Sequence, residues 1–130
     1  MSFPTRAALL ALGDHALPLA DTTRPKGRWE TPAGAMPWVV LSPEVSAFLA
    51  SAQAHGWVSP EVDWMAWRAS DEGRLLLRDR TALTMATATQ LRAIITSVVR
   101  GDRFSEGTIL EAATSGLLAA VAARARALAG

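Results

Sequence analysis

A chain of 130 residues, half of them apolar, is long enough to bury one hydrophobic core and too apolar to be intrinsically disordered. It has no cysteine, which excludes disulfides and thiolate metal sites, and its net charge of +1 disfavours nucleic-acid binding. A signal-peptide pattern and an apolar stretch of bilayer length are both missing, so we expect one globular domain over residues 1–130, cytoplasmic and without membrane contact.

The first forty residues predict one short helix followed by a loop. Thr5 can cap a first helix that ends near Gly13. Residues 18–37 are rich in proline, glycine and polar side chains, which favours loop structure. Aromatic and β-branched side chains near residues 27–41 favour extended backbone, so we expect a short extended or β-ribbon insertion there.

Two capped helices are predicted in the middle of the chain. Ser42 is a good N-cap, and apolar residues at helical spacing follow it as far as Gly56. Asp63 can cap the next helix, and the Asp-Glu-Gly sequence at residues 71–73 is expected to end or weaken it. Residues 74–83 hold a run of leucines between charges, and no pattern assigns them to an element.

The last third of the chain predicts three further helices. Thr87 and Gln90 form a capping-box pattern at the start of a helix for which Gly101 is a natural C-cap. Ser105 can cap the next helix, and a final alanine-rich helix follows a break at residues 115–116. The predicted fold class is therefore mainly α: a small single-domain helical fold of about six helices with the short ribbon inserted.

Residues 100–107 are the most site-like part of the chain because they place charged side chains between two helices. Arg100 and Arg103 carry guanidinium groups suited to carboxylate or phosphate. Asp102 and Glu106, one helical turn apart, are the acidic pair beside them. These four side chains are candidate ligand-binding residues.

A structural interpretation of this segment is favoured over a reactive one. It assigns Gly101 and Ser105 to helix caps, places Phe104 in the core, and pairs the two arginines with Asp102, Glu106 or Glu111. The alternative is a small-molecule or nucleotide site that uses the two arginines and Glu106.

Five tryptophans lie between residues 29 and 67, and the chain has no tyrosine. Such rings can stack on a base, a sugar or a peptide, or can fill a core or a subunit interface. We favour core or interface, and retain Trp38, Trp64 and Trp67 as candidate ligand-binding residues. The two histidines have no matching ligand pattern, so neither a metal nor a cofactor is expected.

The motifs of this chain resemble those of an uncharacterised bacterial domain-of-unknown-function family, number 6508. Residues 99–107 are similar to its V-R-G-D/E-R-F-x-E/D-G motif, and the tryptophan-rich patterns upstream occur in the same order over about residues 27–125. The resemblance implies a common fold and supplies no activity. Relatives often have cysteine at the position of Ser105 and histidine at that of Thr108, so any metal or redox site on that pair would be lost here.

Together these observations favour a non-enzymatic binding or assembly domain that acts as a homodimer. Its partner surface is expected on the tryptophan-rich N-terminal face or at residues 100–107, and the alanine-rich last helix is a candidate dimer contact. The alternative is a small-molecule or nucleotide-directed enzyme with an Arg/Glu site at that segment. Nucleic-acid binding is less favoured because the net charge is close to zero.

Overall fold

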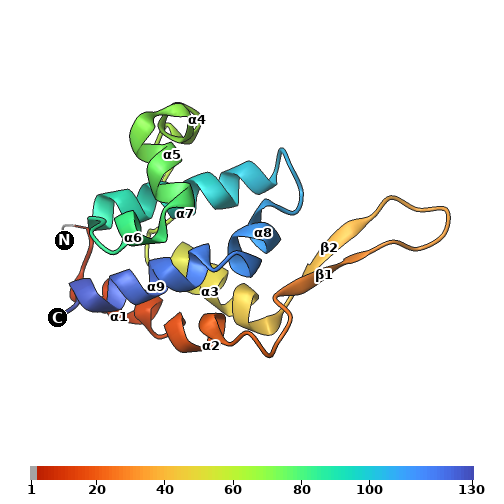
Figure 1. The fold of residues 1–130 in the computed structure, drawn as a ribbon, viewed down its shortest axis with the longest axis horizontal. Helices are drawn as coiled ribbons and strands as arrows, with labels where there is room; N and C mark the ends of the chain where they lie inside the picture. The colour runs from red at the N-terminus through yellow and green to blue at the C-terminus, as the bar shows by residue number, and fades with distance from the viewer. Residues whose placement is uncertain (1–2) are drawn as a thin grey trace.

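The computed structural model describes residues 3–130 and shows a body of helices from which a two-stranded ribbon projects (Figure 1). The helices are α1 (Arg6–Gly13), α2 (Ala16–Ala20), α3 (Pro43–Ala54), α4 (Trp64–Ala69), α5 (Asp71–Arg78), α6 (Arg80–Leu83), α7 (Ala88–Asp102), α8 (Thr108–Thr114) and α9 (Leu117–Leu128). The ribbon pairs β1 (Gly27–Glu30) with β2 (Trp38–Leu41) in antiparallel register, with Trp29 opposite Val39. The mainly α fold class and the short β-ribbon near residues 27–41 are therefore confirmed.

Local capping signals predict several helix starts correctly. The side chains of Thr5, Ser42 and Thr87 each accept a hydrogen bond from the backbone N–H three residues further on. Asp63 does the same for α4, and the Thr87 N–H donates to the side chain of Gln90, which completes the capping box. Each such cap stabilises its helix by about 1 kcal/mol.

Three short helices in the structure, α2, α5 and α6, are not predicted by any sequence pattern. Helix α2 lies partly in the expected loop, and α5 and α6 include most of the unassigned residues 74–83. The acidic side chains of Asp71 and Glu72, expected to end a helix, lie instead in the first turn of α5, where the helix dipole favours negative charge. Gly73 packs so tightly on the carbonyl oxygen of Trp67 that no side chain fits between α4 and α5.

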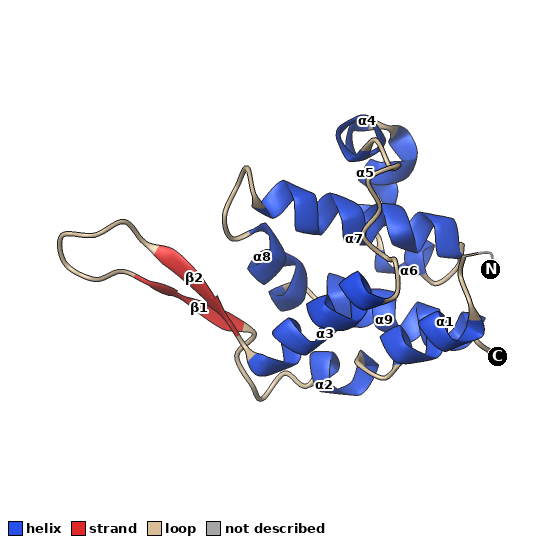
Figure 2. Cartoon of the chain, turned by 180° about the vertical axis from the view of Figure 1, so that it is seen from behind, coloured by secondary structure: helices blue, strands red, loops and turns tan. Residues whose placement is uncertain are grey.

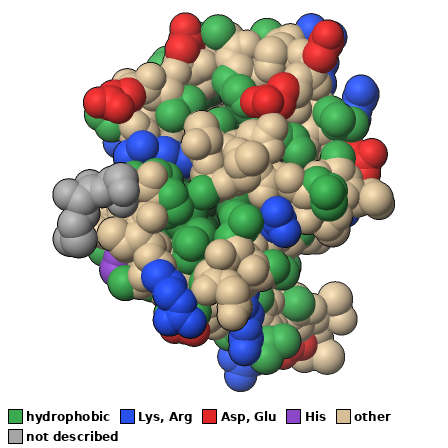
Figure 3. All heavy atoms as spheres, turned by 90° about the vertical axis from the view of Figure 1, so that its left-hand side faces the viewer, with side chains coloured by type: hydrophobic (Ala, Val, Ile, Leu, Met, Phe, Trp, Pro, Cys, Tyr) green, Lys and Arg blue, Asp and Glu red, His purple; other side chains and the backbone are tan. Residues whose placement is uncertain are grey.

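Helix α9 lies at the centre of the body, between α1 and α2 on one side and α7 and α8 on the other (Figure 1). Its apolar stripe is fully or almost fully buried and consists of Leu117, Leu118, Val121, Ala122 and Ala125. This stripe forms the core of its own chain and is not available for the dimer contact considered for this helix. At the end of the body away from the ribbon, apolar side chains gather in the middle of the surface and charged side chains lie mainly around them (Figure 3).

Membrane crossing is not suggested by any single helix of residues 3–130, because none is both long enough and apolar enough. Helices α8 and α9 reach the required length and composition only as a pair, and they bend by 67° at the break between them.

The contact between α1 and α9 depends on a missing side chain at Gly13. A Cβ atom at this position would lie 2.7 Å from Cβ and 3.0 Å from Cα of Arg126. The glycine, which is the last residue of α1, therefore allows the backbones of the two helices to approach closely.

We predict that Gly13→Ala lowers the free energy of unfolding by about 1–3 kcal/mol, because the added methyl group overpacks this contact. Helix propensity alone predicts the opposite sign, a gain of about 1 kcal/mol. Urea unfolding followed by circular dichroism separates the two expectations, and a stabilised variant would contradict the close packing of α1 on α9.

Candidate functional site

The predicted boundaries of the segment at residues 100–107 differ from those in the structure. Helix α7 continues through Gly101 and ends at Asp102, so the predicted C-cap at Gly101 is wrong. Helix α8 begins after Gly107, whose φ of +102° places it in the left-handed region that favours glycine. The predicted N-cap at Ser105 is also wrong, because Gly107 and not Ser105 precedes the first residue of α8.

Asp102 caps α8 from the end of α7. Its Oδ1 accepts hydrogen bonds from the N–H of Gly107 at 3.2 Å and from the N–H of Ile109 at 3.0 Å. A carboxylate at this place satisfies free N–H groups and opposes the positive end of the helix dipole. Asp102 thereby closes the chain reversal between the two helices.

Gly101 lies where two side chains of α4 cover α7. A Cβ atom on this buried residue would lie 3.3 Å from Nη1 of Arg68 and 3.8 Å from the ring of Trp64. The Trp64 ring also contacts Phe104, with the two ring centroids 5.9 Å apart. Phe104 is 75% exposed, so its predicted place in the core is wrong.

Glu106 and Gly107 hold the base of the ribbon. The Glu106 Oε2 accepts a hydrogen bond from the N–H of Val39 in β2 at 2.8 Å. A Cβ atom at Gly107 would lie 2.7 Å from ring atom Cζ2 of Trp29, so the glycine gives the indole of β1 a surface to pack on. The segment therefore joins the helical body to the ribbon through one hydrogen bond and one ring contact.

The two arginines of the segment do not pair with its carboxylates. Within residues 3–130 neither Arg100 nor Arg103 forms an ion pair, so the predicted pairing with Asp102, Glu106 or Glu111 is wrong. A hollow of about 450 Å³ beside the segment is bordered by Glu106 and by neither arginine. The two arginines and Glu106 therefore do not converge on this hollow.

The tryptophans retained as ligand candidates occupy separate environments. Trp38 lies on β2 and is 45% exposed, whereas Trp64 is half-buried against Phe104. Trp67 is also half-buried and donates its Nε1–H to a carboxylate. No two tryptophan rings stack on each other in the described part of the chain, so they form no common platform there.

The carboxylate that receives the Trp67 hydrogen bond is Glu72, at a distance of 2.7 Å. Glu72 also accepts a hydrogen bond from Nε2 of Gln90 at 2.9 Å. The hydrogen bond from Gln90, and then that from Trp67, lower the pKa of Glu72 below its ordinary value of 4.5. This cluster links α4 and α5 to the start of α7, and no sequence pattern relates the three residues.

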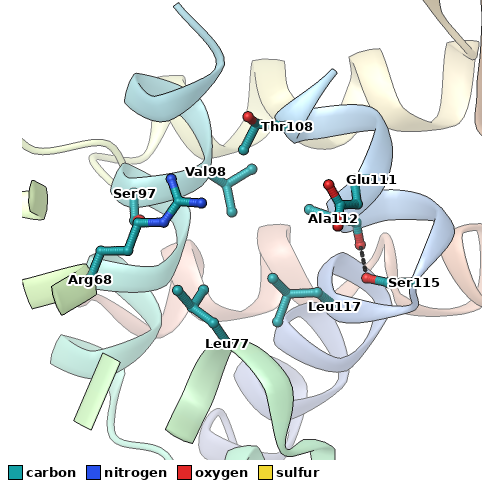
Figure 4. Close-up of a pocket in the computed structure, with 9 residues that line it drawn as sticks. All are labelled: Arg68, Leu77, Ser97, Val98, Thr108, Glu111, Ala112, Ser115 and Leu117. Carbon is teal, nitrogen blue, oxygen red and sulfur yellow. Dashed lines mark hydrogen bonds between the residues drawn. The ribbon is translucent and has the colours of Figure 1, made fainter. Parts of the chain in front are cut away.

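A smaller cavity of about 140 Å³ lies where α4 and α7 face α8, and it shares Thr108, Glu111 and Ser115 with the lining of the first hollow (Figure 4). Arg68, Ser97 and Glu111 bring polar groups to it from three different helices. The spacing of Ser97 and Gly101 on α7 is a signal that marks a face of small residues for another element to cover. Residues 3–130 contain no cluster of three or more potential metal ligands.

A comparison with protein-family models matches residues 8–130 to a family of unknown function (DUF6508). This match confirms the resemblance drawn from the sequence motifs and spans α8, the ribbon and both hollows. No curated protein and no solved structure matches the chain.

We predict that Glu106→Ala accelerates hydrogen exchange of the Val39 amide about tenfold, because a hydrogen bond to a charged acceptor contributes about 1.5 kcal/mol. Glu106→Gln retains an acceptor oxygen and should preserve most of the protection. Amide exchange measured by NMR tests this, and an unchanged Val39 rate in Glu106→Ala would contradict the attachment of the ribbon to Glu106.

Proposed function

We propose that this chain, which belongs to the family of unknown function DUF6508, is a non-enzymatic assembly domain that forms a homodimer through its β-ribbon. The observation that carries the proposal is the outer edge of β1, which has no second strand beside it among residues 3–130. An uncovered strand edge is a ready template for pairing with another chain.

The ribbon projects from the helical body beyond its attachment to Glu106 and Gly107 (Figures 1 and 2). It also carries exposed apolar side chains. Trp29 is 47% exposed, Trp38 is 45% exposed, and Met36 in the connecting loop is 85% exposed. A two-stranded hairpin is marginally stable in water, and apolar side chains gathered on it are typical of an interaction surface. A partner that covers the ribbon would stabilise the hairpin and remove its apolar side chains from water.

The two edges of the ribbon differ in what remains free. The N–H of Val39 points away from β1 and donates to Glu106, so the outer edge of β2 is partly occupied. In an antiparallel ladder, pairs of opposite residues that exchange backbone hydrogen bonds alternate with pairs that do not. In a pair that does not, the N–H and C=O groups of both residues point to the outer edges of the two strands. Trp29 is opposite Val39, so its N–H and C=O face the outer edge of β1.

The sequence of β1 is complementary to itself in one antiparallel register. If two β1 strands pair about a two-fold axis at Trp29, Arg28 of one chain faces Glu30 of the partner subunit. Within one chain these two residues already form an ion pair, with Nε and Oε1 2.6 Å apart. The same register places the two Trp29 rings opposite each other, which is a favourable cross-strand pair. A stable interface buries at least about 1,000 Å², so we expect Met36 and Trp38 to be covered as well.

A catalytic site at residues 100–107 has less support. Asp102 and Glu106 each use a carboxylate oxygen to accept backbone N–H groups, which is a structural task. Arg100 and Arg103 form no ion pair with these acids in the described chain. The side chains required for acid–base chemistry are therefore not assembled around a common point.

We predict that the native chain is a dimer by gel filtration with light scattering, and that Arg28→Glu and Glu30→Arg are each monomers because like charges then face each other across the interface. Mixing the two variants should restore a dimer, since two acids on one chain then face two arginines on the other. Both variants lack the internal ion pair, so recovery on mixing reports a contact between chains.

The ion pair between Arg24 and Glu44, which lies at the body end of the ribbon, supplies the matched control. Arg24→Glu and Glu44→Arg should leave the dimer unchanged, alone or mixed. A native chain that stays monomeric at high concentration, or variants at residues 28 and 30 that do not re-associate, would contradict the proposed interface.

A further inference from the structure

The cavity of about 140 Å³ beside α8 combines an apolar floor with two opposite charges (Figure 4). Leu77, Val98 and Leu117 supply aliphatic surface, while Arg68 and Glu111 bring charged groups to it from α4 and α8. An apolar hollow with a small number of convergent polar groups is the usual form of a small-molecule site.

Both charged side chains are available to a ligand. Arg68 and Glu111 are exposed, and neither forms an ion pair within residues 3–130. The position of the Arg68 guanidinium depends on Gly101, because even a methyl group there would lie 3.3 Å from Nη1. A guanidinium set against a helix backbone in this way is suited to receive a carboxylate in bidentate geometry.

A third polar group comes from a buried residue of α7. Ser97 is only 2% exposed and lines the cavity. No side-chain hydrogen bond of Ser97 is found within residues 3–130, and its oxygen is not among the fully buried atoms that lack a partner, so the hydroxyl is open to the cavity. The neighbouring Thr96 hydroxyl, by contrast, donates to the carbonyl of Trp57. The cavity therefore offers a ligand a hydroxyl that can donate or accept a hydrogen bond.

The size of the cavity narrows the class of ligand. At about 140 Å³ it is well below the roughly 300 Å³ at which sites for drug-sized molecules begin, so a nucleotide does not fit. A ligand of this size that satisfies one cation, one anion and an aliphatic floor must itself carry both charges on a short apolar stem.

We propose that this cavity binds a short aliphatic amino acid as a zwitterion. Its carboxylate pairs with the Arg68 guanidinium and accepts a hydrogen bond from the Ser97 hydroxyl. Its ammonium group is directed to the Glu111 carboxylate, and its side chain packs on Leu77, Val98 and Leu117. Because both charged residues are exposed, we expect an affinity in the millimolar range.

The proposal is tested on the native chain with three probes that share the same branched four-carbon unit. L-Valine carries both charges, isovalerate lacks the ammonium group, and isobutylamine lacks the carboxylate. Titration of each to about 10 mM, followed by backbone amide shifts in NMR, measures affinity and location together. We expect valine to shift amides of α7 and α8 around the cavity, and the other two probes to bind at least about tenfold more weakly.

Two variants and two matched controls assign the contacts. Arg68→Gln and Glu111→Gln should each weaken valine binding at least about tenfold, whereas Arg78→Gln and Glu61→Gln, which change exposed charges outside the cavity, should not. Retention of the native pattern of amide shifts shows that each variant is folded. Valine that does not shift the cavity amides, a single-charge probe that binds as well as valine, or binding that is insensitive to Arg68→Gln would each overturn the proposal.

Discussion

The arrangement of the C-terminal half depends on the hydrogen bonds that the carboxylate of Asp102 accepts. Its hydrogen bonds to the N–H groups of Gly107 and Ile109 cap α8 and set the direction in which this helix leaves the turn. Because α8 carries Glu111 to the cavity of about 140 Å³, and because the turn before it holds the base of the ribbon, one cap positions both features. The charged segment at residues 100–107 therefore has a structural role, because it joins α7, α8 and the ribbon.

Those features that depend on neighbouring residues are visible in the sequence. Thr5, Ser42 and Thr87 cap their helices as predicted, since a cap needs only a suitable side chain and an N–H three residues away. The ribbon near residues 27–41 and the mainly α class follow from equally local patterns. Short helices such as α2 and α6 are missed because their stability comes from packing on other elements.

The misassigned residues are those whose role depends on distant parts of the chain. Gly101 is a residue type typical of C-caps, but here a glycine is required because two side chains of α4 lie directly over it. Ser105 is a residue type typical of N-caps, but the side chain of Asp102 accepts the hydrogen bonds from the free N–H groups at the start of α8 instead. Arg68 and Ser97 carry no motif, and only the packing of α4 on α7 brings them to one cavity. The site was therefore less predictable than the fold, because it depends on tertiary contacts.

One experiment tests directly whether the cap at α8 holds the ribbon as well as the helix. Hydrogen exchange measured at the amides of Ile109 and Val39 in Asp102→Ala, with Asp102→Asn as the variant that keeps an acceptor oxygen, separates local from coupled effects. We expect faster exchange at both amides in Asp102→Ala and near-native exchange in Asp102→Asn. Faster exchange at Ile109 with an unchanged rate at Val39 would contradict this expectation.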